Sequence, residues 1–191
     1  MDAEVVDTVY DNIQLPGLFL GYRIPPQGTE DAYALEVLNT VLSGGQSSRF
    51  YKTLVDESNW VWPCRPFHTT WKMAASLSHW ALPTWVLTVK ALKEGIDNEI
   101  DKVRDELISE REYKKVINQL ESDFIASNST MSGIAESLAN YHVYFDNANL
   151  INTEIEKYRA VSREDIKRVA NKYLSAKNRV ILYYLPKEQM N

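Results

Sequence analysis

Three short stretches of the chain alternate apolar with other positions. Two lie near the start, from Val5 to Val9 and from Leu18 to Pro25, and the third runs from Arg179 to Leu185, where Pro186 ends it. In the second stretch the alternating residues are Leu18, Leu20, Tyr22 and Ile24 against Phe19, Gly21 and Arg23. Alternation with a period of two is typical of a strand with one buried face. The pattern therefore predicts strands at both ends of the chain.

Between these strands, apolar residues recur every three or four positions, which is the spacing of an amphipathic helix. The predicted inner faces are Leu35, Leu38, Val41 and Leu42; Phe50, Tyr51 and Leu54; Ile96, Ile100, Val103 and Leu107; Tyr113, Val116, Ile117, Leu120 and Phe124; Ile134, Leu138, Tyr141 and Phe145; Ile155 and Tyr158; and Ile166, Val169, Ala170 and Tyr173. Helices concentrated between terminal strands favour an α+β layer over alternating βαβ units. We expect one domain over residues 1–191.

Several residues are typical of helix ends. The pair Gly44-Gly45 is expected to end the first helix, and Ser47 to cap the second. Ser109 and Glu112 have the spacing of a capping box, and Ser162 is expected to begin the last helix. These residues predict where the connecting turns fall.

The overall composition, 45% hydrophobic and 25% charged residues, is that of an ordinary globular protein. A net charge of −5 leaves no excess of positive charge for phosphates, so we expect no nucleic-acid partner. No run approaches the roughly 20 apolar residues of a membrane span. The single cysteine, Cys64, excludes an internal disulfide but does not distinguish the bacterial cytoplasm from the periplasm. We expect a soluble protein of one of these compartments.

Residues 60–89 form an anomalous segment. All five tryptophans (Trp60, Trp62, Trp71, Trp80 and Trp85) lie here, and no Asp or Glu occurs from Ser58 through Lys93, where about six would be expected. One interpretation is an aromatic-lined binding surface, and another is a pair of buried, aromatic-rich strands. The interpretation that we favour is translation from a shifted reading frame.

Codon logic supports the shifted frame. When the last base of one codon is joined to the first two of the next, Trp71-Lys72 becomes Glu, Lys72-Met73 becomes Asp or Asn, and Met73-Ala74 becomes Gly. Acidic residues and glycine thus return to a segment that lacks them. The shift also creates a turn-forming sequence in place of Thr70 to Ala74.

No self-contained active site is evident among the scarce catalytic residue types. His68 and His79 are eleven positions apart, and a metal site built from them with Cys64 is a minor alternative. His142 lies in a predicted helix, where a hydrogen-bonded structural role is more common than that of a general base. The sequence also lacks the Gly-x-Ser-x-Gly elbow of the serine hydrolases and the phosphate-binding Gly-x-x-x-x-Gly-Lys.

Several motifs nevertheless resemble one family. Ala34–Leu38, Leu42–Gly45 and Ser47–Glu57 resemble the second domain of the pitrilysin-type (M16) zinc peptidases, the family of insulin-degrading enzyme and the mitochondrial processing peptidase. Further segments in the same order are Gly21–Pro25, Ile108–Glu112, Asn118–Glu121, Tyr158–Ile166 and Val180–Pro186. The resemblance covers nearly the whole chain and is interrupted from Trp60 to about Val89, where the shifted translation resembles the family better.

The resemblance implies an α+β fold with a mostly antiparallel sheet and a layer of helices on one face. It also implies that the zinc of the parent protein lies in an N-terminal domain with an inverted His-x-x-Glu-His motif, which this chain lacks. In part of the family an Arg and a Tyr bind the substrate carbonyl, but the aligned positions here are Val55 and Trp62. We therefore expect no catalytic residue, no metal ligand and no cofactor in this chain.

The expected function is that of a non-catalytic C-terminal domain, a fragment of a longer zinc-dependent metalloendopeptidase. It would form part of the wall of the peptide-binding chamber and contact the N-terminal zinc-binding domain. The candidate contact residues are Gly44, Gly45, Ser47, Ser48 and Arg49. The alternative for these residues is a plain helix–helix turn with an exposed arginine.

The expected partners are the zinc-binding domain, the parent's peptide substrate and a second chain in a homo- or heterodimer. Two other functions stay open. One is a domain of a catalytically inactive scaffold subunit, which the family includes. The other is an independent binding module that uses the tryptophan-rich segment. An upstream His-x-x-Glu-His motif would distinguish an active parent from a scaffold.

Overall fold

The computed structural model describes residues 3–57, 65–70, 75–81 and 88–187. The strands are β1 (Val5–Asp11), β2 (Gly17–Ile24), β3 (Arg65–Thr70), β4 (Ala75–Ala81) and β5 (Arg179–Pro186). The helices are α1 (Glu30–Ser43), α2 (Val89–Asp105), α3 (Glu110–Ser127), α4 (Met131–Phe145), α5 (Leu150–Ala160) and α6 (Arg163–Tyr173), with a π-helical segment η1 (Tyr51–Glu57) and a short 3₁₀ turn η2 (Ala176–Asn178).

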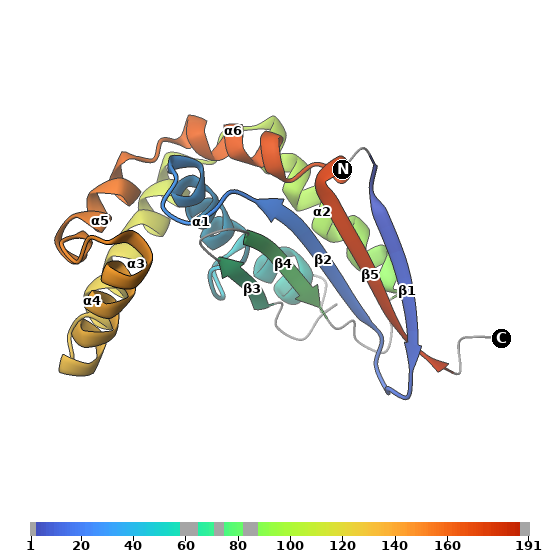
Figure 1. Cartoon of the computed structure of the whole chain (residues 1–191). Helices are drawn as coiled ribbons and strands as arrows, with labels where there is room; N and C mark the ends of the chain where they lie inside the picture. The colour runs from blue at the N-terminus through green and yellow to red at the C-terminus, as the bar shows by residue number, and fades with distance from the viewer. Residues whose placement is uncertain (1–2, 58–64, 71–74, 82–87, 188–191) are drawn as a thin grey trace.

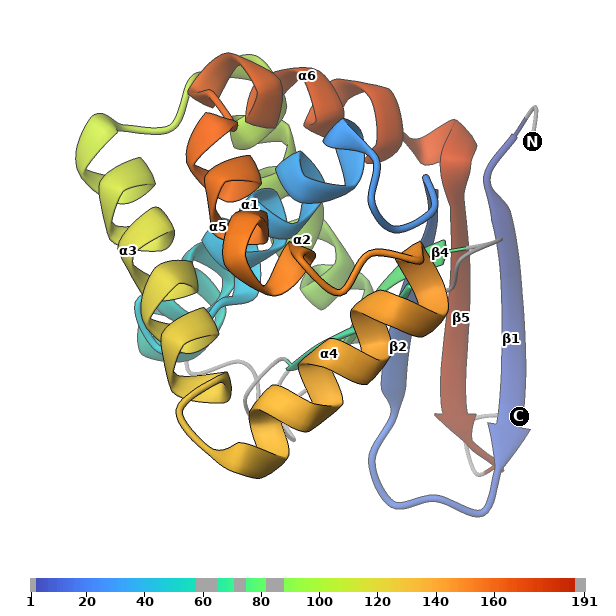
Figure 2. The same ribbon diagram turned by 60° about the vertical axis from the view of Figure 1, so that its left-hand side comes forward.

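The five strands form one sheet in the order β1-β5-β2-β4-β3. The pairs β5–β2, β2–β4 and β4–β3 are antiparallel, and only β1 and β5 run parallel. The helices lie on one side of the sheet, with α1, α2 and α6 directly behind it and α3, α4 and α5 farther out (Figures 1 and 2). The expected α+β fold with a mostly antiparallel sheet and one helical layer is confirmed.

The alternation in β2 separates core from surface as its sequence predicts. Leu18, Leu20 and Tyr22 are at most 1% exposed and face the helices. They pack with the inner stripes of α1, α2 and α6, whose buried members include Leu38, Ile96 and Ile166. The hydrophobic core therefore lies between the central strands and these three helices.

Most predicted helix ends are confirmed. The Ser109 hydroxyl caps α3 by accepting from the Glu112 backbone N–H at 3.2 Å, but the Glu112 carboxylate pairs with Arg49, so only half of the predicted capping box is present. Ser162 begins α6 as expected and forms a complete capping box with Asp165. Gly44 caps α1, where its N–H donates to the carbonyl oxygen of Thr40 at 2.9 Å.

Two helix boundaries differ from the prediction. The helix after the glycines begins at Arg49, and the carbonyl of Ser48 accepts its first backbone bond, from Lys52 at 3.1 Å. The cap position is thus Ser48 rather than Ser47, because Ser47 still belongs to the glycine turn. α2 ends at Asp105, since the next residue is extended, and Leu107 is 42% exposed instead of lying on the inner face of that helix.

The anomalous segment contains the described strands β3 and β4, which pair with each other and join the sheet through β2. A strand pair is therefore present, as one interpretation expected, while the burial of its side chains lies outside the described residues. Trp60, Trp62, Trp71 and Trp85 lie outside them as well. The shifted reading frame stays a prediction.

Candidate interaction surfaces

The five residues predicted to make contacts belong to one turn, Gly44–Arg49, which we call the glycine loop. Gly45 has φ = +89°, a left-handed conformation that strains residues with a side chain. A Cβ on Gly44 would lie 2.4 Å from the carbonyl oxygen of Thr40. Both glycines are therefore required by the backbone path that links α1 to the helix starting at Arg49.

One face of α3 holds the glycine loop in place. Arg49 forms a bidentate pair with Glu112, Nε to Oε1 at 2.9 Å and Nη2 to Oε2 at 2.8 Å. Lys115 Nζ donates to the carbonyl and the hydroxyl of Ser47 at 2.9 and 3.1 Å. Since Glu112 and Lys115 are one turn apart, α3 presents them together to the loop.

Electrostatics strengthen this attachment. Burial alone would raise the pKa of the Glu112 carboxyl, but the hydrogen bonds and charge of Arg49 outweigh it, and the pKa lies below its usual value. The hydrogen bond with Glu112 raises the pKa of Arg49 in turn. Bidentate arginine–carboxylate pairs of this kind are stronger and more directional than ordinary surface ion pairs.

The glycine loop thus has an anchored part and an accessible part. Ser48 is 2% exposed, and the Arg49 side chain is only 22% exposed because it lies on Glu112. The segment is a turn between two helices, as the alternative expects, but its arginine is not exposed; contact with another domain stays a prediction. Gly45, Gln46 and Ser47 are exposed. Of the predicted contact residues, Gly45 and Ser47 are the two that a partner can reach most directly.

A second accessible surface was missed by the sequence reasoning. It is the side of the sheet that carries no helices, which we call the open face. Its exposed apolar residues are Val5, Val9, Phe19 and Val180, each 37% to 44% exposed. Tyr184 lies beside Phe19, with ring centroids 6.5 Å apart in an edge-to-face arrangement. The sequence of β2 could have indicated this surface, because Phe19 is a large apolar residue on the side of the strand that faces away from the core.

The residues considered for metal binding do not form a metal centre in the described part of the chain. No group of three or more His, Cys, Asp or Glu side chains there could hold a metal ion. His142 is exposed on α4, with Nδ1 4.0 Å from Asp146 Oδ1, so it is not a buried structural histidine. The described donor set does not fit zinc. The side chains of His68 and His79, together with Cys64, lie outside the described residues.

The two positions aligned with the family's substrate-binding pair also lack that chemistry. Val55 lies in η1 and carries no charge, and Trp62 lies outside the described residues. No helix of the described residues is long and apolar enough to cross a membrane.

The described residues thus form a one-sided α+β layer with an anchored glycine loop. Residues 3–120 match the family model described as the peptidase M16 inactive domain. The chain belongs to this family.

The chain is also similar to one named protease and to two solved structures. It is 24% identical over 176 residues to zinc protease PqqE of Helicobacter pylori, covering 92% of this chain and 39% of that protein. The crystal structure of a protease from Helicobacter pylori superposes with a TM-score of 0.90 at 22% identity, covering 97% of this chain and 44% of that one. A chain of Complex III2 from Candida albicans gives a TM-score of 0.79 at 13% identity, covering 96% and 46%. The chain spans about two fifths of the length of these relatives.

Proposed function

We propose that this chain is the non-catalytic C-terminal domain of a zinc-dependent metalloendopeptidase, where it forms part of the peptide-binding chamber wall and of the interface with the N-terminal zinc-binding domain. The family membership and the similarity to a zinc protease support this function. In the parent, zinc would polarise the scissile carbonyl and activate water, and this domain would supply binding surface only.

The observation that carries the proposal is the open face. A sheet that exposes Phe19 and Val180 on the side without helices is suited to an interface, because exposed apolar residues grouped on one face mark contact surfaces. The relatives are more than twice as long as this chain, so their remaining length is available to cover such a face. The exposed part of the glycine loop offers a second, polar contact for the zinc-binding domain.

The experiment uses the coding sequence on both sides of this chain, expressed as one protein. We expect that protein to bind one zinc ion and to cleave unfolded peptides, and the 191-residue chain alone to do neither. Phe19→Asp on the open face should raise KM for peptide at least several-fold with zinc content unchanged. Ile125→Asp, at a 69% exposed position on α3, is the matched control and should leave KM unchanged.

Peptide cleavage by the 191-residue chain alone, abolished by a chelator, would contradict the proposal. A parent without an upstream His-x-x-Glu-His motif would favour the second candidate, an inactive scaffold subunit. The fold shared with a chain of Complex III2 keeps that candidate in view. The independent tryptophan-rich binding module remains a prediction, which Trp71→Ala and Trp80→Ala would test by loss of ligand binding.

A further inference from the structure

The strand β1 lies at one edge of the sheet. It pairs with β5 on one side, and no described helix or strand lies beside its outer side (Figures 1 and 2). The strand is seven residues long and contains no proline, glycine or lysine. Natural proteins often use proline, lysine or a very short strand to keep a sheet edge from pairing with another chain. Because β1 has none of these features, its outer side is open to a further strand.

β1 is also exposed on both of its faces. Val5 and Val9 belong to the open face and are 44% and 37% exposed. Val6 and Tyr10 lie on the side that carries the helices, because Val6 pairs with the buried Ile181, yet they are 52% and 37% exposed. A helix packed on one face would leave the apolar residues of the other face in water. A strand added in the plane of the sheet brings side chains to both faces, so this exposure favours a strand as the partner.

Side-chain bonds hold β1 in place at both ends. Just before the strand, the carboxylate of Glu4 accepts from Arg179 Nε at 2.8 Å, and the same arginine bonds Asp97 on α2. At the other end, the Tyr184 hydroxyl donates to Asp11 Oδ2 at 2.5 Å. The exposed residues between these anchors therefore lie on a strand that is already fixed in position. Preorganisation of this kind lowers the entropy lost on binding.

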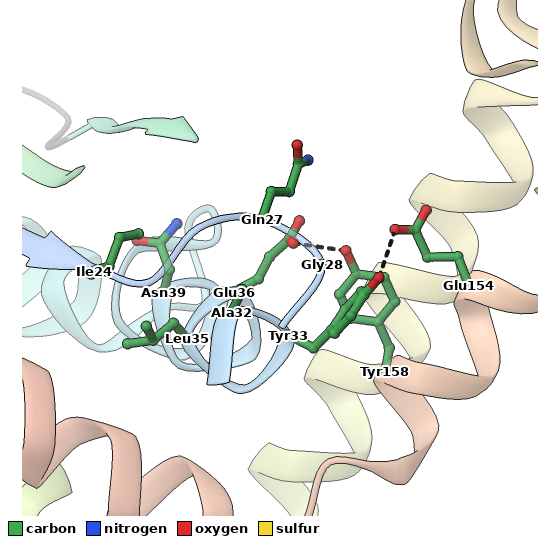
Figure 3. A pocket seen from close by; sticks show the side chains of 10 residues that line it. All are labelled: Ile24, Gln27, Gly28, Ala32, Tyr33, Leu35, Glu36, Asn39, Glu154 and Tyr158. Carbon is green, nitrogen blue, oxygen red and sulfur yellow. Dashed lines mark hydrogen bonds between the residues drawn. The ribbon is translucent and has the colours of Figure 1, made fainter. Parts of the chain in front are cut away.

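The cavity between α1 and α5 offers no comparable opening. It has a volume of about 120 Å³, and its two carboxylates, Glu36 and Glu154, are bonded within the chain (Figure 3). The Tyr158 hydroxyl donates to Glu36 at 2.7 Å, and the hydroxyls of Tyr33 and Tyr141 donate to Glu154. These carboxylates already have partners, whereas the outer side of β1 has none among the described strands.

The sequence of β1 is complementary to a second copy of itself. In an antiparallel pair centred on Thr8, all seven residues of the strand face the same seven residues of the second copy. The pairs are Thr8 with Thr8, Val6 with Tyr10, Asp7 with Val9, and Val5 with Asp11. A β-branched residue opposite an aromatic one stabilises neighbouring strands, and no two carboxylates are directly opposed in this register.

The neighbouring registers are disfavoured by charge. An antiparallel pair centred on Asp7 places this residue directly opposite Asp7 of the second copy. A pair centred on Val9 places Asp7 opposite Asp11. Like charges that lie directly opposite each other destabilise a strand pair. The register centred on Thr8 thus uses the whole strand and is flanked on both sides by registers that oppose two aspartates.

We propose that two copies of this chain associate through β1, as an antiparallel strand pair with its two-fold axis at Thr8. The two sheets then become continuous, and Val5 and Val9 join the open faces of both copies into one apolar surface. The proposal does not rest on the proposed function, because it concerns pairing between copies of this chain alone.

Cysteine substitutions in a Cys64→Ser background test the register. Thr8→Cys places two thiols opposite each other at the axis, with Cα atoms about 4.5–5.5 Å apart, which is within the range of a disulfide. We expect a covalent dimer after mild oxidation, measured by intact mass. Val6→Cys, on the same strand, is the matched control and should not cross-link, because its thiol lies about 13 Å along the strand from that of the second copy. Adding Tyr10→Cys to Val6→Cys should restore the cross-link.

Sedimentation equilibrium of the 191-residue chain measures the association itself. We expect a reversible monomer–dimer equilibrium, which Thr8→Lys should weaken by about ten-fold or more because it opposes two ammonium groups at the axis. Ser132→Lys, at an exposed position of α4, adds the same charge elsewhere and should leave the dissociation constant unchanged. Since Thr8 is exposed, both variants should keep the circular dichroism spectrum and melting temperature of the unmodified chain.

Three results would overturn the proposal. The first is a chain that stays monomeric at millimolar concentration, which would mean that a different partner covers the edge. The second is a dimer that a folded Thr8→Lys variant does not weaken, because its contact would then lie on another surface. The third is cross-linking of Val6→Cys as readily as of Thr8→Cys, because the strands would then pair in another register.

Discussion

The two faces of the central strands β2 and β5 differ sharply although they are built from the same residues in alternation. On the helical face Leu18, Leu20 and Ile181 are at most 1% exposed, while on the open face Phe19 and Val180 are 40% and 38% exposed. Adjacent residues of β2 therefore belong to different environments. The first face stabilises the fold, and the second is available for contacts. The apolar character of a strand residue does not by itself reveal which of these tasks it performs.

The prediction with the largest effect on this comparison of the two sheet faces concerns the amino-acid sequence of residues 60–89. β4 pairs with β2 in a register that places Trp80 opposite Phe19, so the segment extends the sheet beside the central strand. Translation in the shifted frame places Glu, Asp or Asn, and Gly between the paired Thr70 and Ala75, which is turn chemistry at a strand–strand connection. We expect the protein made from the native gene to differ in intact mass from the 22.0 kDa of the printed sequence. Agreement with the printed mass would end this hypothesis.

The next largest effect should separate the two faces energetically. Leu20→Ala should lower the free energy of unfolding by about 2–5 kcal/mol, because it leaves a cavity in a fully buried site. Phe19→Ala should lower it by less than about 1 kcal/mol, since much of that ring already faces solvent. Urea unfolding of both variants measures the difference. Equal losses would mean that the open face is as tightly packed as the core.

A smaller effect concerns Asp31, which ties α1 to α6. Burial alone would raise the pKa of this carboxyl, but hydrogen bonds from Lys172, Tyr173 and Arg168 outweigh it and hold the pKa well below its usual range. A carboxyl whose pKa is lower in the folded state than in the unfolded state stabilises the fold at pH values above its unfolded-state pKa. That stabilisation is lost as the pH falls from the unfolded-state pKa through the folded-state pKa. Asp31→Asn should therefore cost about 1–2 kcal/mol at pH 7, a moderate value because Arg168 and Lys172 are about half exposed.

The pH dependence supplies the check on Asp31. The stability difference between wild type and Asp31→Asn should shrink as the pH falls below about 4, where the unfolded carboxyl becomes protonated. Asp123→Asn, at an exposed position of α3, serves as the control and should show no such trend. A difference that stays constant down to pH 2 would mean that the charge of Asp31 is not the source of the stabilisation.

The smallest predicted effect tests the anchoring of the glycine loop. A double-mutant cycle of Arg49→Ala and Glu112→Ala should give a coupling energy of about 1 kcal/mol, because the pair is bidentate and mostly buried. The same cycle at Lys114 and Glu110, both nearly 70% exposed, should give less than about 0.5 kcal/mol. Similar coupling energies at the two pairs would show that the Arg49–Glu112 pair binds the loop to α3 no more strongly than an ordinary solvent-exposed ion pair.

Local signals in the sequence were sufficient for much of the fold. The alternation of β2, the start of the last helix at Ser162 and the glycine stop after α1 each depend on residues close together in the chain, and all three are confirmed. The error at Leu107 has the same origin. The apolar residues keep their helical spacing as far as Leu107, although the backbone is already extended at Glu106. The spacing of apolar residues alone does not show where a helix ends.

Contacts between distant segments could not be predicted. Arg49 meets Glu112 across 63 positions, and Tyr158 meets Glu36 across 122, so no local pattern relates either pair. The cavity between α1 and α5 depends on such pairings, which explains why none of its lining residues was a candidate contact or metal-binding residue from the sequence. The exposed part of the glycine loop was within reach of sequence reasoning, but its attachment to α3 was not.

The position of β5 between β1 and β2 has a consequence for how the molecule is made. The last strand of the chain occupies the second place in the sheet, so β1 has no strand to pair with until residues 179–186 have left the ribosome. Such late, long-range closure is slow compared with helix formation. During synthesis the newborn polypeptide would therefore expose apolar strand surface for most of its length, and it is then that we expect chaperones to matter most to it.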